Sequence, residues 1–199
     1  MMIIFQMAAI FFAAVTTENI FFARALDTIQ LREITKSPRK ILTFGAVLTS
    51  ILLVSSIFLA FIDQWIRIYP LYYYIASIVY LIVNGGVYIG AYLGIKKYIP
   101  TLFQKIGGIL PLASANCAVM GSLLIAARSS ALNTWWKFIV YNLGSGVGFV
   151  LALLLLSSVE RKLAYCKPPK AFSGLPLRLI TVGIVSLAIA GLVGNQLAA

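Results

Sequence analysis

The chain has no histidine, only two cysteines and only five acidic residues among its 199 residues. Two cysteines cannot supply a disulfide framework, and without histidine they cannot complete a four-ligand metal site within one chain. A Ser-His-Asp triad, a phosphate-binding loop and a dinucleotide-binding glycine motif are also missing from the sequence. These absences exclude the familiar kinds of self-contained catalytic site.

Charged residues make up only 11% of the chain, whereas soluble domains contain about 25%. In their place the chain is 61% hydrophobic, with a mean hydropathy of +0.99. Six apolar segments approach or exceed the roughly 20 residues that cross a bilayer as a helix. They comprise residues 3–26, 41–62, 70–95, 106–127, 136–158 and 175–197. The sequence therefore predicts an all-α membrane protein, residues 1–199 forming a single integral membrane domain with six transmembrane helices.

The net charge of +11 is distributed unevenly along the chain. The loops after the first, third and fifth segments, with their flanks, hold five, three and five of the 16 basic residues. The opposite side has only Arg67, Arg128 and Lys137. This positive-inside bias predicts cytoplasmic odd-numbered loops and both termini outside. It argues against a nucleic-acid partner and in favour of the lipid bilayer, whose anionic headgroups these loops can contact. The first segment lacks a basic start and a cleavage site, so we expect a membrane span there and not a signal peptide.

Two of the apolar segments are interrupted at comparable depths. The fourth contains Pro111 and then the polar run Ser114-Ala-Asn-Cys117, and the first contains Thr16-Thr-Glu-Asn19. Proline disrupts a helix interior, and irregular backbone at membrane depth must be buried or line a cavity. Paired broken helices in corresponding positions are typical of inverted repeats with a site near the midplane. We therefore predict two inverted three-helix repeats, residues 1–97 and 98–199, with spans 1 and 4 broken near the midplane.

Glu18 is the carboxylate that lies clearly inside a predicted span. Charges at that depth are usually functional, but Glu18 could equally bond backbone N–H groups freed by the break and merely hold it open. Asp27, Glu33, Asp63 and Glu160 fall at span ends or in loops, so we expect them to be solvated.

The two cysteines and the small residues have ordinary structural interpretations. Cys166 lies in a basic loop and is expected to be a free surface thiol. Cys117 lies in the broken span, where a cysteine is most often a small buried hydrophobe and less often a ligand. Gly144-Ser-Gly-Val-Gly148 favours tight helix packing over ligand contact.

Several motifs in the second half resemble those of the Rnf/Nqr membrane subunits, RnfA/NqrE-like. The matching residues are Lys96-Lys-Tyr-Ile-Pro100, Ile109-Leu-Pro-Leu-Ala-Ser-Ala-Asn-Cys-Ala-Val-Met-Gly121 and Tyr141-Asn-Leu-Gly-Ser-Gly-Val-Gly-Phe149. Glu160-Arg-Lys-Leu163 and the sixth segment are also similar to that family. The resemblance covers residues 95–195 well, and before them it rests on Glu18-Asn19.

The resemblance implies a membrane subunit of an ion-translocating electron-transport complex in a bacterial or archaeal cytoplasmic (inner) membrane. The partners implied are a homologous membrane subunit of opposite topology and the other subunits of the complex. The two homologous subunits would share an intramembrane [2Fe–2S] cluster, to which each gives one cysteine from each half. Cys117 matches the second-half ligand, with Asn116 beside it, and Glu18 and Asn19 are the candidates for the ion pathway.

The chain departs from the family pattern at two places. Ile29 stands where the first-half cysteine is expected, and Ile89-Gly-Ala-Tyr92 lacks the carboxylate usual in the third span. A complete partner would therefore bring the site to three thiolates, so that a cluster would need a fourth ligand from elsewhere. The alternative is a divergent, cluster-free paralogue that acts as a transporter-like or structural membrane subunit.

Overall fold

The computed structural model describes residues 2–16, 19, 37–68, 71–129, 132, 134–165 and 175–193. Helices dominate these residues, and no strand occurs among them. The helices are α1 (Met2–Thr16), α3 (Pro38–Ile66), α4 (Tyr72–Tyr98), α5 (Pro100–Ile106), α6 (Ile109–Ser114), α7 (Cys117–Arg128), α8 (Trp135–Tyr165) and α9 (Leu175–Val193).

Four stretches of helix are long and apolar enough to cross a membrane: Arg39–Ile66, Tyr74–Tyr98, Ile109–Arg128 and Trp135–Val159. Two shorter apolar helices, Ile4–Thr16 and Leu179–Ile189, lie within the first and sixth predicted segments. The remaining parts of those two segments fall mostly outside the described residues. The all-helical membrane class is thus confirmed, and the described residues hold four long and two shorter apolar helices.

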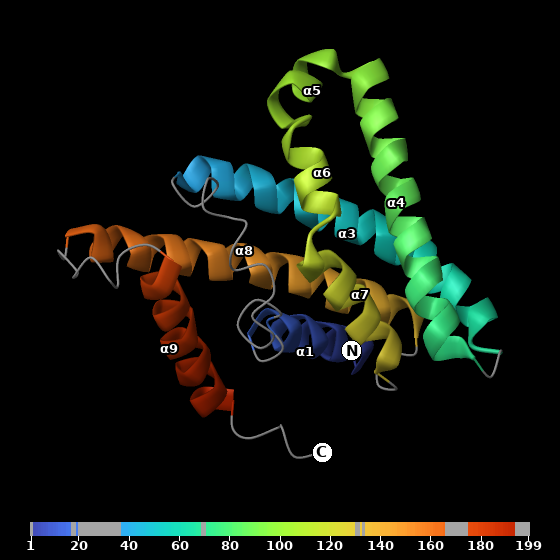
Figure 1. Cartoon of the computed structure of the whole chain (residues 1–199). Helices are drawn as coiled ribbons and strands as arrows, with labels where there is room; N and C mark the ends of the chain where they lie inside the picture. The colour runs from blue at the N-terminus through green and yellow to red at the C-terminus, as the bar shows by residue number, and fades with distance from the viewer. Residues whose placement is uncertain are drawn as a thin grey trace.

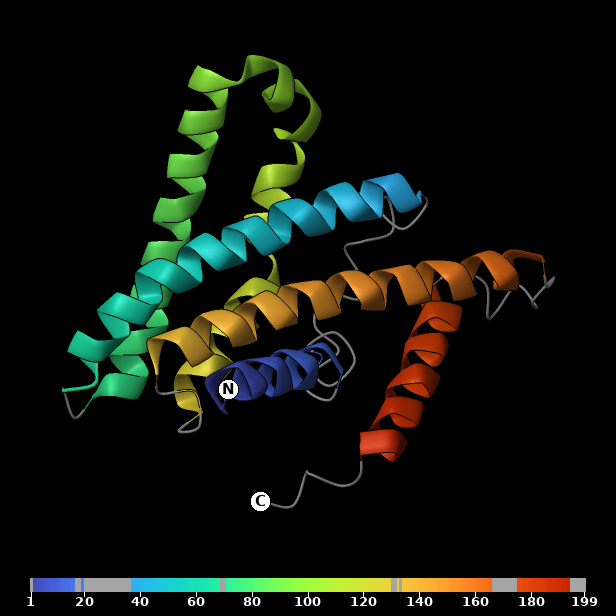
Figure 2. The ribbon, with the colours of Figure 1, turned by 180° about the vertical axis from the view of Figure 1, so that it is seen from behind.

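The centre of the molecule is an antiparallel pair of long helices. Helices α3 and α8 lie side by side and run in opposite directions, and α1 packs against the other side of α8 (Figure 1; Figure 2). Helices α4, α5 and α6 form an arm that rises from α3, while α9 leans away from α8 (Figure 1). The rings of Phe44 and Phe149 join α3 to α8 with centroids 6.4 Å apart. The buried core therefore runs along the α3–α8 contact.

Glycines on α8 allow its neighbours to approach closely. A Cβ at Gly144 would lie 2.8 Å from the Phe11 carbonyl oxygen of α1, and one at Gly146 would lie 2.9 Å from the Thr49 side chain of α3. Inside a membrane the hydrophobic effect does not drive helices together, because the lipid tails are themselves apolar. Small residues stabilise the contact there by letting the helix backbones pack closely. The prediction of tight packing at Gly144–Gly148 is confirmed.

Asp63 is not solvated, contrary to the expectation from its place near the end of a predicted span. Helix α3 continues past residue 62 to Ile66, so Asp63 lies within the helix, and it is 6% exposed. Its carboxylate accepts hydrogen bonds from Arg67 Nε at 2.6 Å, Tyr72 Oη at 2.6 Å and Tyr80 Oη at 2.7 Å. These three donors offset the cost of removing the carboxylate from water.

The same cluster joins the α3–α4 hairpin to the end of α7. Arg67 Nη2 donates to the Ala127 carbonyl oxygen at 3.2 Å, which satisfies a carbonyl that the end of the helix leaves free, and Tyr72 Oη lies 3.2 Å from the same oxygen. Burial opposes the charge of Arg67, but the hydrogen bond and the negative charge of Asp63 outweigh it and raise the pKa of Arg67. Asp63 and Arg67 are thus structural partners at the C-terminal end of α3.

Candidate functional site

The fourth span is broken between α6 and α7. Helix α6 ends at Ser114, and Asn116 adopts an extended conformation before α7 begins at Cys117. The Asn116 side-chain oxygen accepts the backbone N–H of Ala118 at 2.7 Å, so Asn116 is an N-cap that restarts the helix. Asn116 is buried, and its side chain caps the start of α7 at the break.

Pro111 does not itself make this break, although we expected it to disrupt a helix interior. It lies in the first turn of α6, which begins at Ile109 after Gly107 and Gly108. The first N–H groups of a helix have no partner within it, so a proline there removes no intrahelical bond. The helix ends after Ser114, downstream of the proline.

Two further helices hold the broken span in place. Asn84 of α4 donates from Nδ2 to the Ser114 carbonyl oxygen at 2.9 Å, and its Oδ1 accepts the hydroxyl of Ser55 of α3 at 3.1 Å. All three residues are buried. Because backbone groups inside a bilayer must be satisfied within the protein, this relay supplies a partner for a carbonyl at the end of α6.

Sequence reasoning did not single out Asn84 or Ser55. Asn84 is the one amide side chain in the apolar segment 70–95, and a polar side chain at such depth is itself a signal of function or interhelical bonding. The sequence could therefore have identified Asn84 as a candidate. Its partner at Ser114, 30 residues away, could be known only from the fold.

The end of α1 is attached to a different helix. Asn19 is buried, and its Nδ2 donates to the Val15 carbonyl oxygen at 3.0 Å and to the Gly148 carbonyl oxygen of α8 at 2.8 Å. Asn19 thus attaches the end of α1 to the middle of α8. Glu18 and Ile29 lie outside the described residues.

Cys117 is the first residue of α7, and its side chain is exposed on the surface of this chain. The thiol is therefore not the small buried hydrophobe that is most usual for cysteine, and it lies at a helix N-terminus, where negative charge is favoured. Within the part of the chain that the structure describes, no three His, Cys, Asp or Glu residues are grouped closely enough to hold a metal ion. Cys166 lies outside that part.

Comparison with known families agrees with the resemblance seen in the motifs. The sequence matches the family described as "Rnf-Nqr subunit, membrane protein" over residues 7–195. The match extends through the first half, where the motifs were few.

Individual relatives have names of the same kind. The chain is 29% identical over 186 residues to the A component of the ion-translocating oxidoreductase complex of Syntrophotalea carbinolica, covering 93% of this chain and 95% of that protein. It is 28% identical over 192 residues to the A component of the Na(+)-translocating ferredoxin:NAD(+) oxidoreductase complex of Acetobacterium woodii, covering 94% and 97%. Over 103 residues it is 39% identical to the E component of the Na(+)-translocating NADH-quinone reductase of Alcanivorax borkumensis, covering 52% and 49%.

Proposed function

This chain belongs to the Rnf-Nqr family of membrane subunits, and we propose that it serves as the A- or E-type membrane component of an ion-translocating electron-transport complex. The observation that carries the proposal is the family match over residues 7–195. It is joined by the break in the fourth span, where Asn116 caps the start of α7 beside the exposed thiol of Cys117. The relatives named above are components of such complexes. The protein would act within a complex and not as an enzyme alone.

We further propose an inverted repeat of residues 1–97 and 98–199 with six spans and both termini outside. The packing supports it, because α1 contacts α8 while α6 and α7 contact α3. Helices of each proposed repeat thus contact the long helix of the other repeat. A two-fold axis in the membrane plane that relates α3 to α8 would produce this arrangement. The setting is a bacterial or archaeal cytoplasmic membrane, and the partner of matching shape is a homologous subunit of opposite topology.

The functional test uses membrane vesicles from a host strain that lacks this chain and is complemented with variants. Loss of the chain should abolish Na⁺ or H⁺ uptake driven by electron flow, and a tagged chain should purify together with other redox subunits. We place Glu18 and Asn19 in the ion pathway, so Glu18→Gln should lower ion uptake while leaving assembly intact. Unchanged uptake in the deletion strain, or purification of the chain without other subunits, would contradict the proposal.

The donor set does not fit a complete iron–sulfur site. A [2Fe–2S] cluster of this kind takes four thiolates, whereas this chain offers Cys117 and has Ile29 where the resemblance places the second ligand. A homologous subunit with two cysteines would bring the total to three. This shortage of thiolates favours a second candidate function: a cluster-free subunit with a transporter-like or structural role.

Metal analysis of the purified complex separates the two candidates. If Cys117 is a ligand together with Asn116 beside it, Cys117→Ala should lower iron and acid-labile sulfide by one cluster per complex, while Cys166→Ala should change neither. If the subunit is cluster-free, both variants should retain the iron, sulfide and visible absorbance of the wild-type complex.

A further inference from the structure

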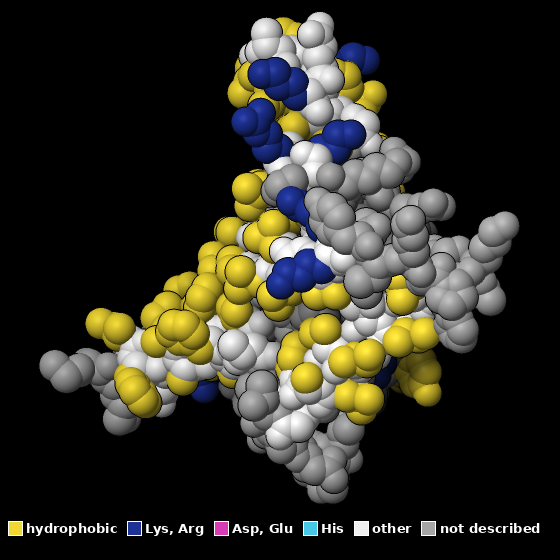
Figure 3. Space-filling view, turned by 90° about the vertical axis from the view of Figure 1, so that its left-hand side faces the viewer, with side chains coloured by type: hydrophobic (Ala, Val, Ile, Leu, Met, Phe, Trp, Pro, Cys, Tyr) yellow, Lys and Arg dark blue, Asp and Glu magenta, His cyan; other side chains and the backbone are white. Residues whose placement is uncertain are grey.

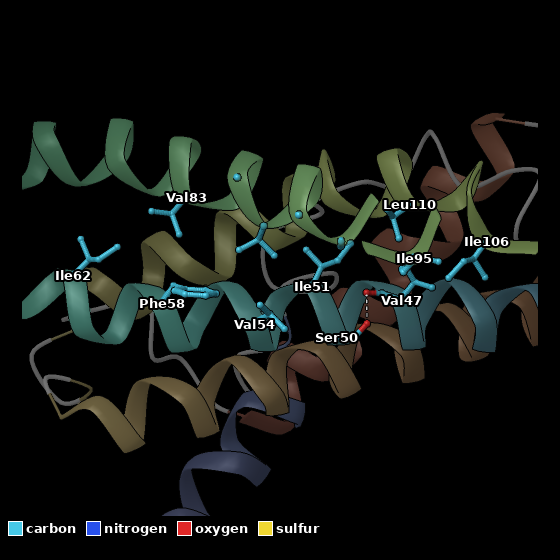
Figure 4. A pocket seen from close by; sticks show the side chains of 14 residues that line it. Val47, Ser50, Ile51, Val54, Phe58, Ile62, Val83, Ile95, Ile106 and Leu110 are labelled. Carbon is cyan, nitrogen blue, oxygen red and sulfur yellow. Dashed lines mark hydrogen bonds between the residues drawn. The ribbon is translucent and has the colours of Figure 1, made fainter. Parts of the chain in front are cut away.

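An apolar groove opens between α3 and α4, with a volume of about 630 Å³ (Figure 4). It runs from Ile62 and Val83 at one end to Val47 and Ile95 at the other, where Ile106 also lines it. Ser50 is the polar side chain of the lining, and its hydroxyl already donates to the Val47 carbonyl oxygen at 2.8 Å. The groove therefore presents hydrocarbon and makes no demand for a polar ligand within it.

The dimensions of the groove suit an acyl chain. From Val83 to Ile95 the helix rises about 18 Å at 1.5 Å per residue, which is close to one leaflet of a hydrocarbon core about 30 Å thick. The wall at Gly86 and Gly90 is open, since a Cβ at either position would meet nothing within 4 Å.

Basic residues follow or precede, in sequence, two residues that line one end of the groove. Ile95 and Ile106, which line that end, are directly adjacent in sequence to Lys96 and Lys105, and Lys96, Lys97 and Lys105 are all exposed. Lys and Arg side chains gather on this face of the molecule, including the top of the arm that α4 and α5 form (Figure 3). The described buried carboxylate, Asp63, lies near the other end of α3, within its own hydrogen-bonded cluster. The groove thus combines an apolar channel with a positive end on the predicted cytoplasmic side.

We propose that this groove binds one anionic phospholipid of the cytoplasmic leaflet. Its phosphate would lie among Lys96, Lys97 and Lys105, and one acyl chain would extend along α4 past Gly90 and Gly86. Basic pockets between membrane helices on the cytoplasmic side recognise anionic headgroups in this way. The proposal rests on the groove and its charges and is independent of the electron-transport function.

Native mass spectrometry of the purified full chain, titrated with phosphatidylglycerol or phosphatidylcholine, tests the site. We expect one phosphatidylglycerol to bind in preference to phosphatidylcholine. Each of Lys96→Gln, Lys97→Gln and Lys105→Gln should weaken its binding about fivefold, which corresponds to the ~1 kcal/mol gained per basic residue at an anionic surface. Lys→Arg at the same positions should restore it.

Matched variants identify the source of any loss. The triple variant Arg39→Gln, Lys40→Gln and Lys162→Gln removes three exposed charges at the start of α3 and near the end of α8 and should leave phosphatidylglycerol binding unchanged. Gly90→Leu should abolish binding with every lysine intact, because its side chain would fill the open groove.

Two results would overturn the proposal. A loss of phosphatidylglycerol binding in the Arg39, Lys40 and Lys162 triple variant as large as the combined loss from Lys96→Gln, Lys97→Gln and Lys105→Gln would mean diffuse attraction to the whole basic face. Retained phosphatidylglycerol binding in Gly90→Leu would mean that no acyl chain enters the groove. If Gly90→Leu instead releases other subunits from the complex while lipid binding persists, the groove holds a neighbour's helix.

Discussion

Three asparagines satisfy backbone groups at the end of α1 and at the break between α6 and α7, each by a different hydrogen bond. Asn116 accepts from the N–H of Ala118, Asn84 donates to the Ser114 carbonyl oxygen, and Asn19 donates to the Val15 and Gly148 carbonyl oxygens. An unsatisfied backbone group inside a bilayer costs several kcal/mol. The amide side chains of Asn84 and Asn116 supply partners for such groups at the break between α6 and α7.

Asn84 offers the clearest test of this role. Asn84→Ala removes the partner of the Ser114 carbonyl and of the Ser55 hydroxyl, so it should lower the free energy of unfolding by about 1–3 kcal/mol. The measurement is denaturant unfolding of the purified chain in detergent micelles. Thr43→Ala is the control, because its exposed hydroxyl bonds only to the Arg39 carbonyl oxygen one turn away, and it should change stability by less than about 0.5 kcal/mol. Equal effects of the two substitutions would show that Asn84 does not hold the break.

At the scale of helices, the molecule is assembled by close contacts on α8. Helix α1 approaches α8 at Gly144 and Gly148, and α3 approaches it at Gly146. These glycines occupy the faces of α8 that meet other helices, whereas Gly183 of α9 and Gly94 of α4 have nothing within 4 Å of an added Cβ. The same residue type therefore has different roles in different helices.

Gly144→Ala should separate α1 from α8. The new Cβ would lie 2.8 Å from the Phe11 carbonyl oxygen and 2.9 Å from the Ala14 Cβ, and forcing extra volume into a packed contact costs about 1–3 kcal/mol. Gly183→Ala is the matched control and should be neutral or slightly stabilising, because alanine favours helix by up to about 1 kcal/mol over glycine. The measurement is the midpoint of thermal unfolding of both variants in the same detergent. Equal midpoints would contradict the packing assigned to Gly144.

At the scale of the whole molecule, charge sets the orientation in the membrane. The exposed basic residues at the start of α3, the α4–α5 turn and the end of α8 gather at one side (Figure 3). The polar cluster of Asp63 and Arg67 lies at the other end of α3. The positive-inside rule assigns the first side to the cytoplasm.

Labelling with a membrane-impermeant thiol reagent tests this orientation in a chain that lacks both native cysteines. Ile68→Cys lies beyond the outer end of α3 and is 80% exposed, so it should react in intact cells. Gln104→Cys, exposed on α5, should react only in inverted vesicles. The reverse pattern would show that both termini lie in the cytoplasm.

Residue order alone was enough to assign the membrane class, the break at residues 114–117 and the packing role of Gly144–Gly148. Those features depend on local composition, because a long apolar run, a helix cap and a glycine cluster act through neighbours in the chain. The helix α5 between the third and fourth spans was missed, since seven residues give too short a pattern to distinguish a helix from a loop.

Partners that are distant in the chain emerged only when the helices were packed. Asp63 was expected in water, yet the hydroxyl of Tyr80, 17 residues away, and that of Tyr72 allow it to be buried. Asn84 meets Ser114 across 30 residues, and Asn19 meets Gly148 across 129. Whether a polar side chain faces water, lipid or another helix depends on which helices lie beside it, and that arrangement is a property of the folded chain.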